Sequence, residues 1–164
     1  MIATSLALAL AQAAEANPVA TCAAPVPVPA GMQGWEQPAP IAAGASTAET
    51  PVLPVGSAVT ATLLPSARVT YAAAPAKPAA AASHGGVFAV TVATPGRYRV
   101  ALGGAAWVDV VSASTPIASA AHGHGPACST IRKMVDFDLK PGRYFVEVAG
   151  STATVVRLMI VRMC

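Results

Sequence analysis

The chain of 164 residues has little charge and few aromatic side chains. Charged residues make up 10% of the sequence, and Phe, Trp and Tyr together make up 5%. The formal net charge is +3, and no run of Lys or Arg is long enough to form a surface for nucleic acid. Hydrophobic residues reach 54%, but many are Ala, which buries little area. We therefore expect one small domain with no nucleic-acid partner.

Recognisable catalytic motifs are also missing. The sequence has no Gly-x-Ser-x-Gly elbow, and no Gly-rich phosphate loop leads into a helix. The six carboxylates that follow residue 16 are scattered along the chain. Ser and His occur together in residues 112–130, but the sequence assigns them no acid partner. A small enzyme is therefore the least favoured of three functional hypotheses.

No apolar run approaches the ~20 residues that cross a bilayer, so we expect no integral membrane span. The run at residues 2–11 has instead the length of the apolar core of a signal peptide, although no Lys or Arg precedes it. Small residues spaced as in cleavage sites follow, and we predict a signal peptide at 1–16. The hypothesis is a periplasmic or secreted protein. The alternative is a short apolar helix at the start of a cytosolic protein.

Cysteine is scarce, and the three cysteines, Cys22, Cys128 and Cys164, all follow the predicted cleavage site. In an oxidising compartment this number predicts one disulfide bond and one free thiol. Three pairings are possible, and the sequence does not choose among them.

Residues 17–55 hold eight of the 15 prolines and are predicted to form an extended Pro/Ala-rich arm. Trp35 is the only aromatic residue in this arm. A single large aromatic among small residues is best explained as an anchor that docks the arm onto the domain. The functional alternative is an exposed platform on which a sugar stacks.

Residues 56–164 are predicted to form an all-β domain, an antiparallel β-sandwich of jelly-roll-like type. Short alternating apolar segments separated by Gly and Pro are typical of that class. Strands are expected at 58–64, 69–71, 88–92, 98–102, 106–111, 133–139, 144–148 and 153–161. Residues 72–86 are expected to form a long loop, and residues 112–130 a loop that crosses between the sheets.

One short phrase occurs twice, as Pro95-Gly96-Arg-Tyr and as Pro141-Gly142-Arg-Tyr. Pro fixes φ and Gly accepts a positive φ, so each phrase predicts a type II turn that joins a hairpin. The apolar positions before the two turns are out of step by one residue. Because of this offset, we interpret the two copies as one turn sequence that is used twice, and not as two equivalent half-domains.

Two groups of proteins share patterns with this chain. Within 87–161, the segments 88–92, 96–100, 107–111 and 137–146 contain a strand before a Gly-Arg-Tyr turn, a central strand with an acidic residue and a closing Pro-Gly-x-Tyr turn. In these features the stretch resembles the bacterial pre-peptidase C-terminal type of β-sandwich domain. Such domains are non-catalytic accessories of secreted enzymes, so the resemblance implies a β-sandwich with a non-enzymatic role.

The whole chain also resembles a group of short exported proteins of alphaproteobacteria. The shared segments are 34–35, 85–88, 106–110 and 124–133. Some members carry the label homogentisate dioxygenase. Enzymes of that name are far longer and bind iron through two His and one Glu in a cupin, and no set with that spacing is present here, so we do not carry that activity over.

The first candidate site is the loop that contains His122, His124 and Cys128, with His84 or Met163 as additional ligands. Imidazole and sulfur are ligands that suit copper or zinc. This pattern gives the second functional hypothesis, a periplasmic copper- or zinc-binding protein. The alternative is a solvent-exposed loop that a disulfide at Cys128 fixes at one end.

The second candidate site is Trp107 with Asp109, which share one face of a predicted strand. An aromatic ring beside a carboxylate can stack on a sugar and hydrogen-bond to it. The alternative is a Trp107 packed under the arm, with Asp109 holding an Arg or a backbone amide. The leading functional hypothesis is thus an exported non-enzymatic binding or envelope-structural module, with a glycan or an envelope protein as partner.

Overall fold

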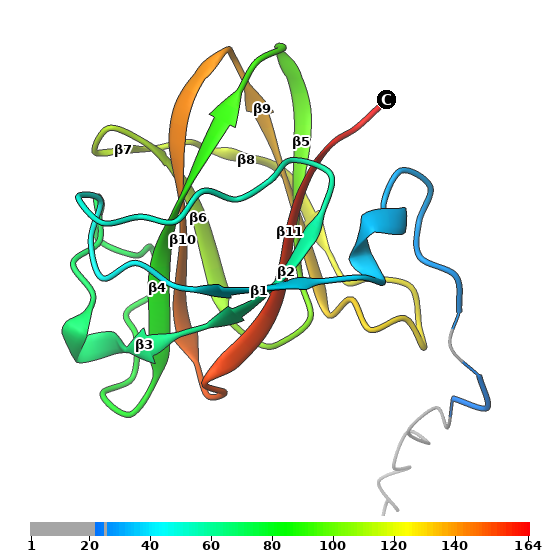
Figure 1. Ribbon diagram of the computed structural model, residues 1–164, viewed down its shortest axis with the longest axis horizontal. Helices are drawn as coiled ribbons and strands as arrows, with labels where there is room; N and C mark the ends of the chain where they lie inside the picture. Colours follow the sequence, from blue (N-terminus) through cyan, green and yellow to red (C-terminus); the bar gives the residue numbers. More distant parts are fainter. Residues whose placement is uncertain (1–21, 25) are drawn as a thin grey trace, which may run out of the picture.

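Two β-sheets pack face to face in the computed structural model, which describes residues 22–24 and 26–164 (Figure 1). This confirms the predicted β-sandwich. Sheet A has the strand order β1 (Ala39–Ala42), β2 (Ala58–Thr62), β11 (Val155–Arg162), β5 (Gly96–Leu102), β9 (Lys133–Leu139) and β8 (Ser119–Gly123). Sheet B has the order β3 (Leu64–Pro65), β4 (His84–Val92), β10 (Gly142–Ser151), β6 (Trp107–Ser112) and β7 (Thr115–Pro116). The predicted signal peptide at 1–16 lies outside the described residues.

The core lies between the sheets and follows from period-two alternation along the strands. Val100 and Leu102 of β5 face Val90 of β4 and Val146 of β10, and all four are fully buried. The carboxylates Asp136 and Asp138, by contrast, lie on the outward face of β9, as the alternation predicts. The burial of large aliphatic side chains on both inner faces therefore holds the sandwich together.

The two Pro-Gly phrases do not form hairpins, and this prediction was wrong. The first connects β4 in sheet B to β5 in sheet A, and the second connects β9 in sheet A to β10 in sheet B. Gly96 and Gly142 each begin a strand, with φ of 155° and 157°, far from the roughly 80° of a type II turn. At Pro95 and Pro141 the chain leaves one sheet for the other instead of turning back within it.

The two corners are equivalent despite the offset in the sequence. Val92, the last residue of β4, pairs with Gly142, and Leu139, the last residue of β9, pairs with Gly96. Three residues separate Val92 from Gly96, and two separate Leu139 from Gly142. The one-residue offset between the two sequence copies therefore lies within the corner. The strand that ends at each corner pairs with the strand that begins at the other.

A tyrosine stabilises each corner in the same way. The hydroxyl of Tyr98 donates to the carbonyl of Thr94 at 2.7 Å, and that of Tyr144 donates to the carbonyl of Lys140 at 3.0 Å. Both bonds reach back four residues to the carbonyl two residues before the Gly. This is the tyrosine corner known from other sandwiches, and it explains why Tyr follows each Pro-Gly pair.

The N-terminal arm lies on the outer face of sheet A, and the prediction that Trp35 anchors it is confirmed. Trp35 ends the short helix η1 (Gln33–Trp35), is fully buried, and packs with Met32 against Ala101 and Met159. Its burial contradicts the alternative of an exposed sugar platform. The cysteine pairing left open by the sequence is Cys22–Cys128, and Cys164 has an exposed free thiol.

The second half of the predicted arm is part of the sandwich itself. Strand β1 pairs in parallel with β2, and the segment that follows it hydrogen-bonds to both sheets. Leu53 donates its N–H to Ala89 in sheet B, and Gly56 donates to Ile160 in sheet A, both at 2.8 Å. The boundary predicted at 55/56 therefore does not separate the arm from the core, since Leu53 belongs to that core.

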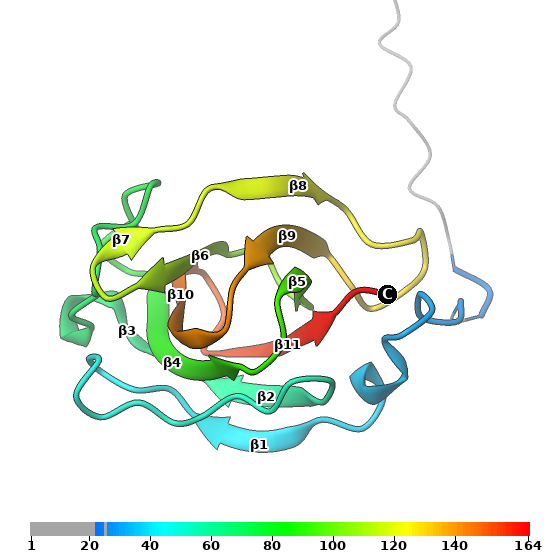
Figure 2. The ribbon, with the colours of Figure 1, turned by 90° about the horizontal axis from the view of Figure 1, so that it is seen from above.

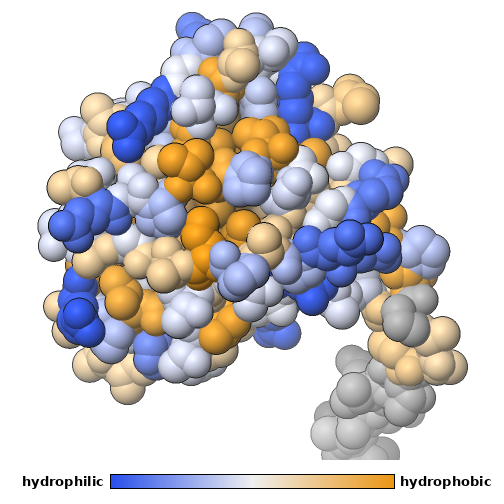
Figure 3. All heavy atoms as spheres, viewed as in Figure 1, coloured by the Kyte–Doolittle hydropathy of each residue, from blue (hydrophilic) through white to orange (hydrophobic). Residues whose placement is uncertain are grey.

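Segment 43–56 also carries exposed apolar side chains. Figure 3 shows apolar atoms gathered in the middle of the face on which β1, β2 and this segment lie in Figure 1. Val52 and Val55 in the segment are 63% and 43% exposed. Within the described part of the chain, no helix has the length and apolar character needed to cross a membrane.

Three local predictions differ from the structure. The expected strand at 69–71 is absent, and a short helical turn, η2 (Ser66–Arg68), precedes it. The strand expected at 58–64 divides at Leu63, where the chain passes from β2 in sheet A to β3 in sheet B. The 112–130 segment does cross between the sheets, but it contains β7 and β8. Strand β8 shows no apolar alternation because all of its residues are exposed at a sheet edge.

Candidate functional site

Figure 2 shows β7 and β8 along one side of the sandwich, where they pair with β6 and β9 as edge strands. Two adjoining pockets are lined by residues of β6, β8 and β9. The outer pocket has a volume of about 520 Å³ and the inner pocket about 210 Å³. Trp107, His122 and Lys133 line both pockets and so form the junction between them. The outer volume lies within the range of about 300–1,000 Å³ that is usual for small-molecule sites.

The two pockets differ in the chemistry of their walls. The outer pocket is lined by Lys77, Arg132 and His124 in addition to the junction residues, and among the described residues no Asp or Glu contributes to its wall. The rest of the outer wall consists of small or apolar residues and one Thr. The additional wall residues of the inner pocket are the apolar Val108, Ile117, Val135 and Phe137 and the polar Ser119 and Asp109.

Three separate elements bring the junction residues together. Trp107 begins β6 immediately after the link that crosses from sheet A, and Lys133 begins β9 on the other sheet. His122 lies on β8, directly opposite Val135 of β9. The junction therefore depends on the crossing segment that the sequence analysis treated as a loop.

Trp107 and Asp109 contact each other, as their shared face predicts. The indole Nε1 of Trp107 donates to Asp109 Oδ2 at 2.9 Å, and the backbone N–H of Ala76 donates to the same oxygen at 3.3 Å. The ammonium of Lys133 lies 4.4 Å from the centre of the Trp107 ring, in a cation–π contact. One face of the indole is thus already occupied by a cation.

Lys133 is half-buried, and its positive charge has few polar partners. Its Nζ donates only a long hydrogen bond, of 3.4 Å, to the carbonyl of Ala106. Burial lowers the pKa of Lys133, and the positive charge of Lys77 lowers it further, while Asp109 acts in the opposite direction. The site therefore holds an ammonium group that would gain from an anion.

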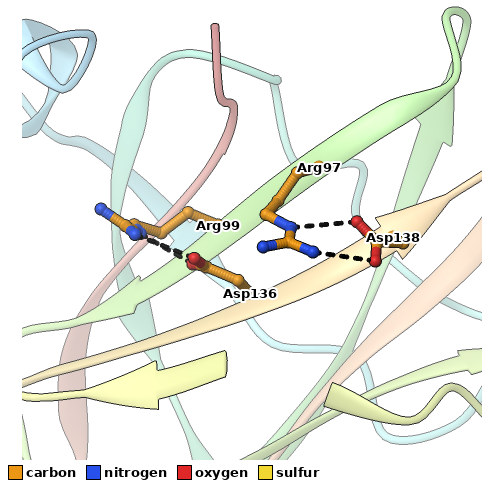
Figure 4. Close-up of polar contacts among 4 residues, drawn as sticks. All are labelled: Arg97, Arg99, Asp136 and Asp138. Atoms are coloured by element: carbon orange, nitrogen blue, oxygen red, sulfur yellow. Dashed lines mark hydrogen bonds and ion pairs between the residues drawn. The ribbon is translucent and has the colours of Figure 1, made fainter. Parts of the chain in front are cut away.

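On the outer face of sheet A, two Arg side chains form ion pairs with two Asp side chains (Figure 4). Arg99 donates to both oxygens of Asp136 at 2.7 and 2.9 Å, and Arg97 donates to both oxygens of Asp138 at 3.0 Å. These bidentate contacts raise the pKa of each Arg and lower that of Asp138.

The cations of the outer pocket have no such partners. In residues 22–24 and 26–164, the ion pairs within 4.0 Å are those of Arg97 and Arg99. Lys77, Arg132 and Lys133 thus converge on one pocket with no carboxylate at ion-pair distance. Within this part of the chain, Arg157 and Arg162 of β11 in sheet A form no ion pair either, so the pocket is distinguished by the convergence of three cations on one wall.

A buried carboxyl group lies next to Asp109 on the outer face of sheet B. Glu147 of β10 pairs directly with Asp109 of β6 and is only 2% exposed. One oxygen accepts the N–H of Ala72, and the other finds no partner among the described residues. Burial raises the pKa of Glu147, and the backbone N–H groups of Ala72 and Ala73 oppose this rise. The two carboxyls thus fasten the 72–76 loop that borders the pocket.

The structure does not assemble the predicted metal set of His122, His124 and Cys128. The sulfur of Cys128 is bonded to Cys22, so it is not available as a thiolate ligand, and this part of the prediction was wrong. No group of three or more His, Cys, Asp or Glu suited to a metal occurs in the described portion. His122 and His124 do share the outer pocket, where His124 Nδ1 lies 3.1 Å from the carbonyl of Arg132.

The additional metal ligands considered from the sequence lie elsewhere. His84 begins β4, and its Nδ1 is buried without a partner. Met163 packs with the cluster around Trp35 on the outer face of sheet A. Neither residue contributes to the wall of the outer or the inner pocket.

Sequence reasoning missed the cations and Glu147. The net charge of +4 over residues 97–164 signalled the excess of Lys and Arg but not where it would gather. Lys133 is the first residue of the strand predicted at 133–139, but the sequence did not indicate that it would lie beside Trp107 at the start of β6. Lys77 lies in a Pro/Ala-rich loop that carries no signal of this kind.

Comparison of the chain with protein-family models, curated proteins and solved structures finds no match. The resemblances drawn from the sequence therefore stay predictions, and the functional argument depends on the geometry of the site.

Proposed function

We propose that this chain is an exported, non-enzymatic binding module whose ligand is held in the two pockets around Trp107. The observation that carries the proposal is the convergence of unpaired cations on a pocket that continues into the core. Pockets with apolar walls and a few converging polar groups are the usual form of a small-molecule site. The Cys22–Cys128 bond supports export, because disulfides persist mainly in oxidising compartments.

The carboxyl groups of the site support binding rather than catalysis. Asp109 accepts two hydrogen bonds on one oxygen, and Glu147 is covered by the 72–76 loop. Neither group is placed as an exposed acid or base beside the outer pocket. In the proposed role these carboxyls hold Trp107 and the loop in position.

Ligand binding is tested by screening the full chain against panels of small acids, neutral small molecules and glycans with tryptophan fluorescence. Trp35 and Trp107 are the only tryptophans, and Trp35 is fully buried. We expect at least one ligand class to change the emission of the parent protein and to lose this effect in Trp107→Ala. If no ligand responds in a Trp107-dependent way, the proposal fails and an envelope-structural role is favoured.

A second candidate function, copper or zinc binding, is favoured by the shared position of His122 and His124 in the outer pocket. Imidazole groups suit both metals, but two of them need further ligands. Calorimetric titration of the mature protein with each metal tests this function. Heat that disappears in the His122→Ala, His124→Ala double variant supports it, and the absence of heat rules it out.

A further inference from the structure

We infer that the ligand of these pockets is a small amphiphilic carboxylate, with its apolar ring or chain in the inner pocket and its carboxylate among the cations of the outer pocket. This inference rests on the proposed binding function and names the ligand class. It depends on the contrast between two pocket walls that meet at Lys133.

The inner pocket fits an apolar group. Val108, Val135 and Phe137 in its wall belong to the main core and are at most 5% exposed, and Ile117 packs against that core. The inner pocket therefore borders the hydrophobic core on one side, while Asp109, Ser119 and His122 contribute to the rest of its wall. An apolar cavity of about 150 Å³ can hold benzene, so 210 Å³ is enough for one ring or a chain of similar size.

The outer pocket fits the anionic end of the same molecule. Lys133 lines both pockets, so a carboxylate bound beside it has its apolar substituent directed to the inner pocket. Lys77 and Arg132 add two more donors that bind anions. A bound carboxylate also offsets the repulsion between Lys77 and Lys133, which together with burial lowers the pKa of Lys133 in the free protein.

A neutral sugar fits this arrangement less well. Stacking on Trp107 competes with the Lys133 ammonium that lies over the ring. Four wall residues of the inner pocket, Val108, Ile117, Val135 and Phe137, offer no hydrogen bond to a hydroxyl group. A buried hydroxyl without a partner lowers affinity, because its bonds to water are not replaced.

The test is calorimetric titration of the full chain with matched probes at physiological ionic strength. Hexanoate and benzoate are the amphiphilic acids, hexan-1-ol and benzamide are their neutral counterparts, and galacturonate is an acid without an apolar part. We expect the two acids to bind at least tenfold more tightly than their neutral counterparts and than galacturonate.

Two variants locate the bound acid, and a third provides the control. Lys133→Met keeps most of the apolar stem and removes the charge, and Ile117→Phe reduces the inner pocket; each should weaken hexanoate binding at least tenfold. Arg143→Met should have no effect, because Arg143 lies over Phe145 and lines neither pocket. If Ile117→Phe fails to fold, Ser119→Leu reduces the same pocket from the exposed strand β8.

The outcomes separate this inference from the proposed function. Equal or tighter binding of the neutral probes, or acid binding unchanged in Lys133→Met, contradicts the inference. Binding of galacturonate or a neutral glycan that depends on Trp107, without binding of the amphiphilic acids, also contradicts it but leaves the binding function intact. If nothing binds in either this series or the wider panel, both fail.

Discussion

The two tryptophans lie in similar chemical surroundings but differ in what covers them. Each has a cation over its ring, Arg157 at 5.5 Å from Trp35 and Lys133 at 4.4 Å from Trp107. Each indole N–H donates to one oxygen, at 2.8 Å to Thr130 and at 2.9 Å to Asp109.

The region around Trp35 is closed by the chain itself. The side chain is fully buried, and Arg157 also donates to the carbonyl of Trp35 at 3.3 Å. The Cys22–Cys128 bond joins the beginning of the arm to the loop that carries Thr130.

The Trp107 side chain, by contrast, is only half-buried and faces the two pockets. We therefore assign a structural role to Trp35 and Arg157, and a ligand-binding role to Trp107 and Lys133.

Replacement of Trp35 gives the largest expected effect. Trp35→Ala should lower the free energy of unfolding by about 3–5 kcal/mol, because it removes a fully buried aromatic side chain and leaves a cavity. Trp107→Ala should cost about 1 kcal/mol, since that side chain is half-buried. Urea unfolding measures both values. A larger loss for Trp107→Ala would reverse the assignment of the structural tryptophan.

Removal of the disulfide should loosen the Trp35 region and leave the Trp107 region unchanged. The bond closes a loop with a sequence separation of 106 residues, for which the loss is about 2–5 kcal/mol. In the Cys22→Ser, Cys128→Ser double variant, hydrogen exchange at the Trp35 indole N–H should accelerate. Equal acceleration at Trp107 would show that the two regions open together, contrary to the comparison.

Glu147, which pairs with Asp109 near Trp107, should make the free energy of unfolding depend on pH. Its pKa is raised in the folded protein, so its contribution is fully present below the ordinary value of 4.5 and is lost as the pH rises through the folded value. Glu147→Gln keeps a carbonyl that accepts the N–H of Ala72 and carries no charge. The free energy of unfolding of the parent protein, relative to that of this variant, should therefore fall as the pH rises above 4.5.

Urea unfolding of both proteins between pH 4 and 8 measures this difference. The matched control is Asp138→Asn, whose carboxyl is exposed and has a lowered pKa, so its difference from the parent should run in the opposite direction with pH. A difference between parent and Glu147→Gln that does not change with pH would contradict the proposed burial cost of the ionised carboxyl.

Replacement of Lys133 gives the smallest expected effect on stability. Lys133→Met should change the free energy of unfolding by no more than about 0.5 kcal/mol, because the cation has no ion-pair partner and its stem is retained. Thermal unfolding measures this change, with Arg143→Met as the matched cation over an aromatic ring. A loss above about 2 kcal/mol would show that Lys133 stabilises the fold as Arg99 does, and that the pocket cations are structural.

The strand pattern of the second half of the chain could be predicted because alternation records which residues face the core. The same pattern also placed Trp107 and Asp109 on one face and Asp136 and Asp138 outward. It could not distinguish a hairpin from a corner between sheets, since a Pro-Gly pair between two alternating strands is compatible with both. Pairing between distant strands makes that distinction, and the tyrosine hydroxyls then stabilise the corner.

The pocket could be predicted only in part. His122 and Trp107 were both candidates, but for separate sites, because nothing in the sequence shows that β8 pairs with β9 and so brings His122 to the pockets that Trp107 lines. Strand β8 is fully exposed and lacks the apolar alternation that identifies buried strands. The burial of Glu147 was equally hidden, since its position alternates with core valines as a solvent-facing residue would, and the distant 72–76 loop covers it.

The most direct test follows the two indole N–H signals by ¹H–¹⁵N NMR while hexanoate is added to the full chain. The comparison predicts that the Trp107 signal shifts in a saturable way and that the Trp35 signal stays in place. It also predicts that the shift is lost in Lys133→Met and kept in Arg143→Met. A Trp107 signal that does not move with hexanoate, or a shift confined to Trp35, would contradict the assignment of a closed structural tryptophan and an open binding tryptophan.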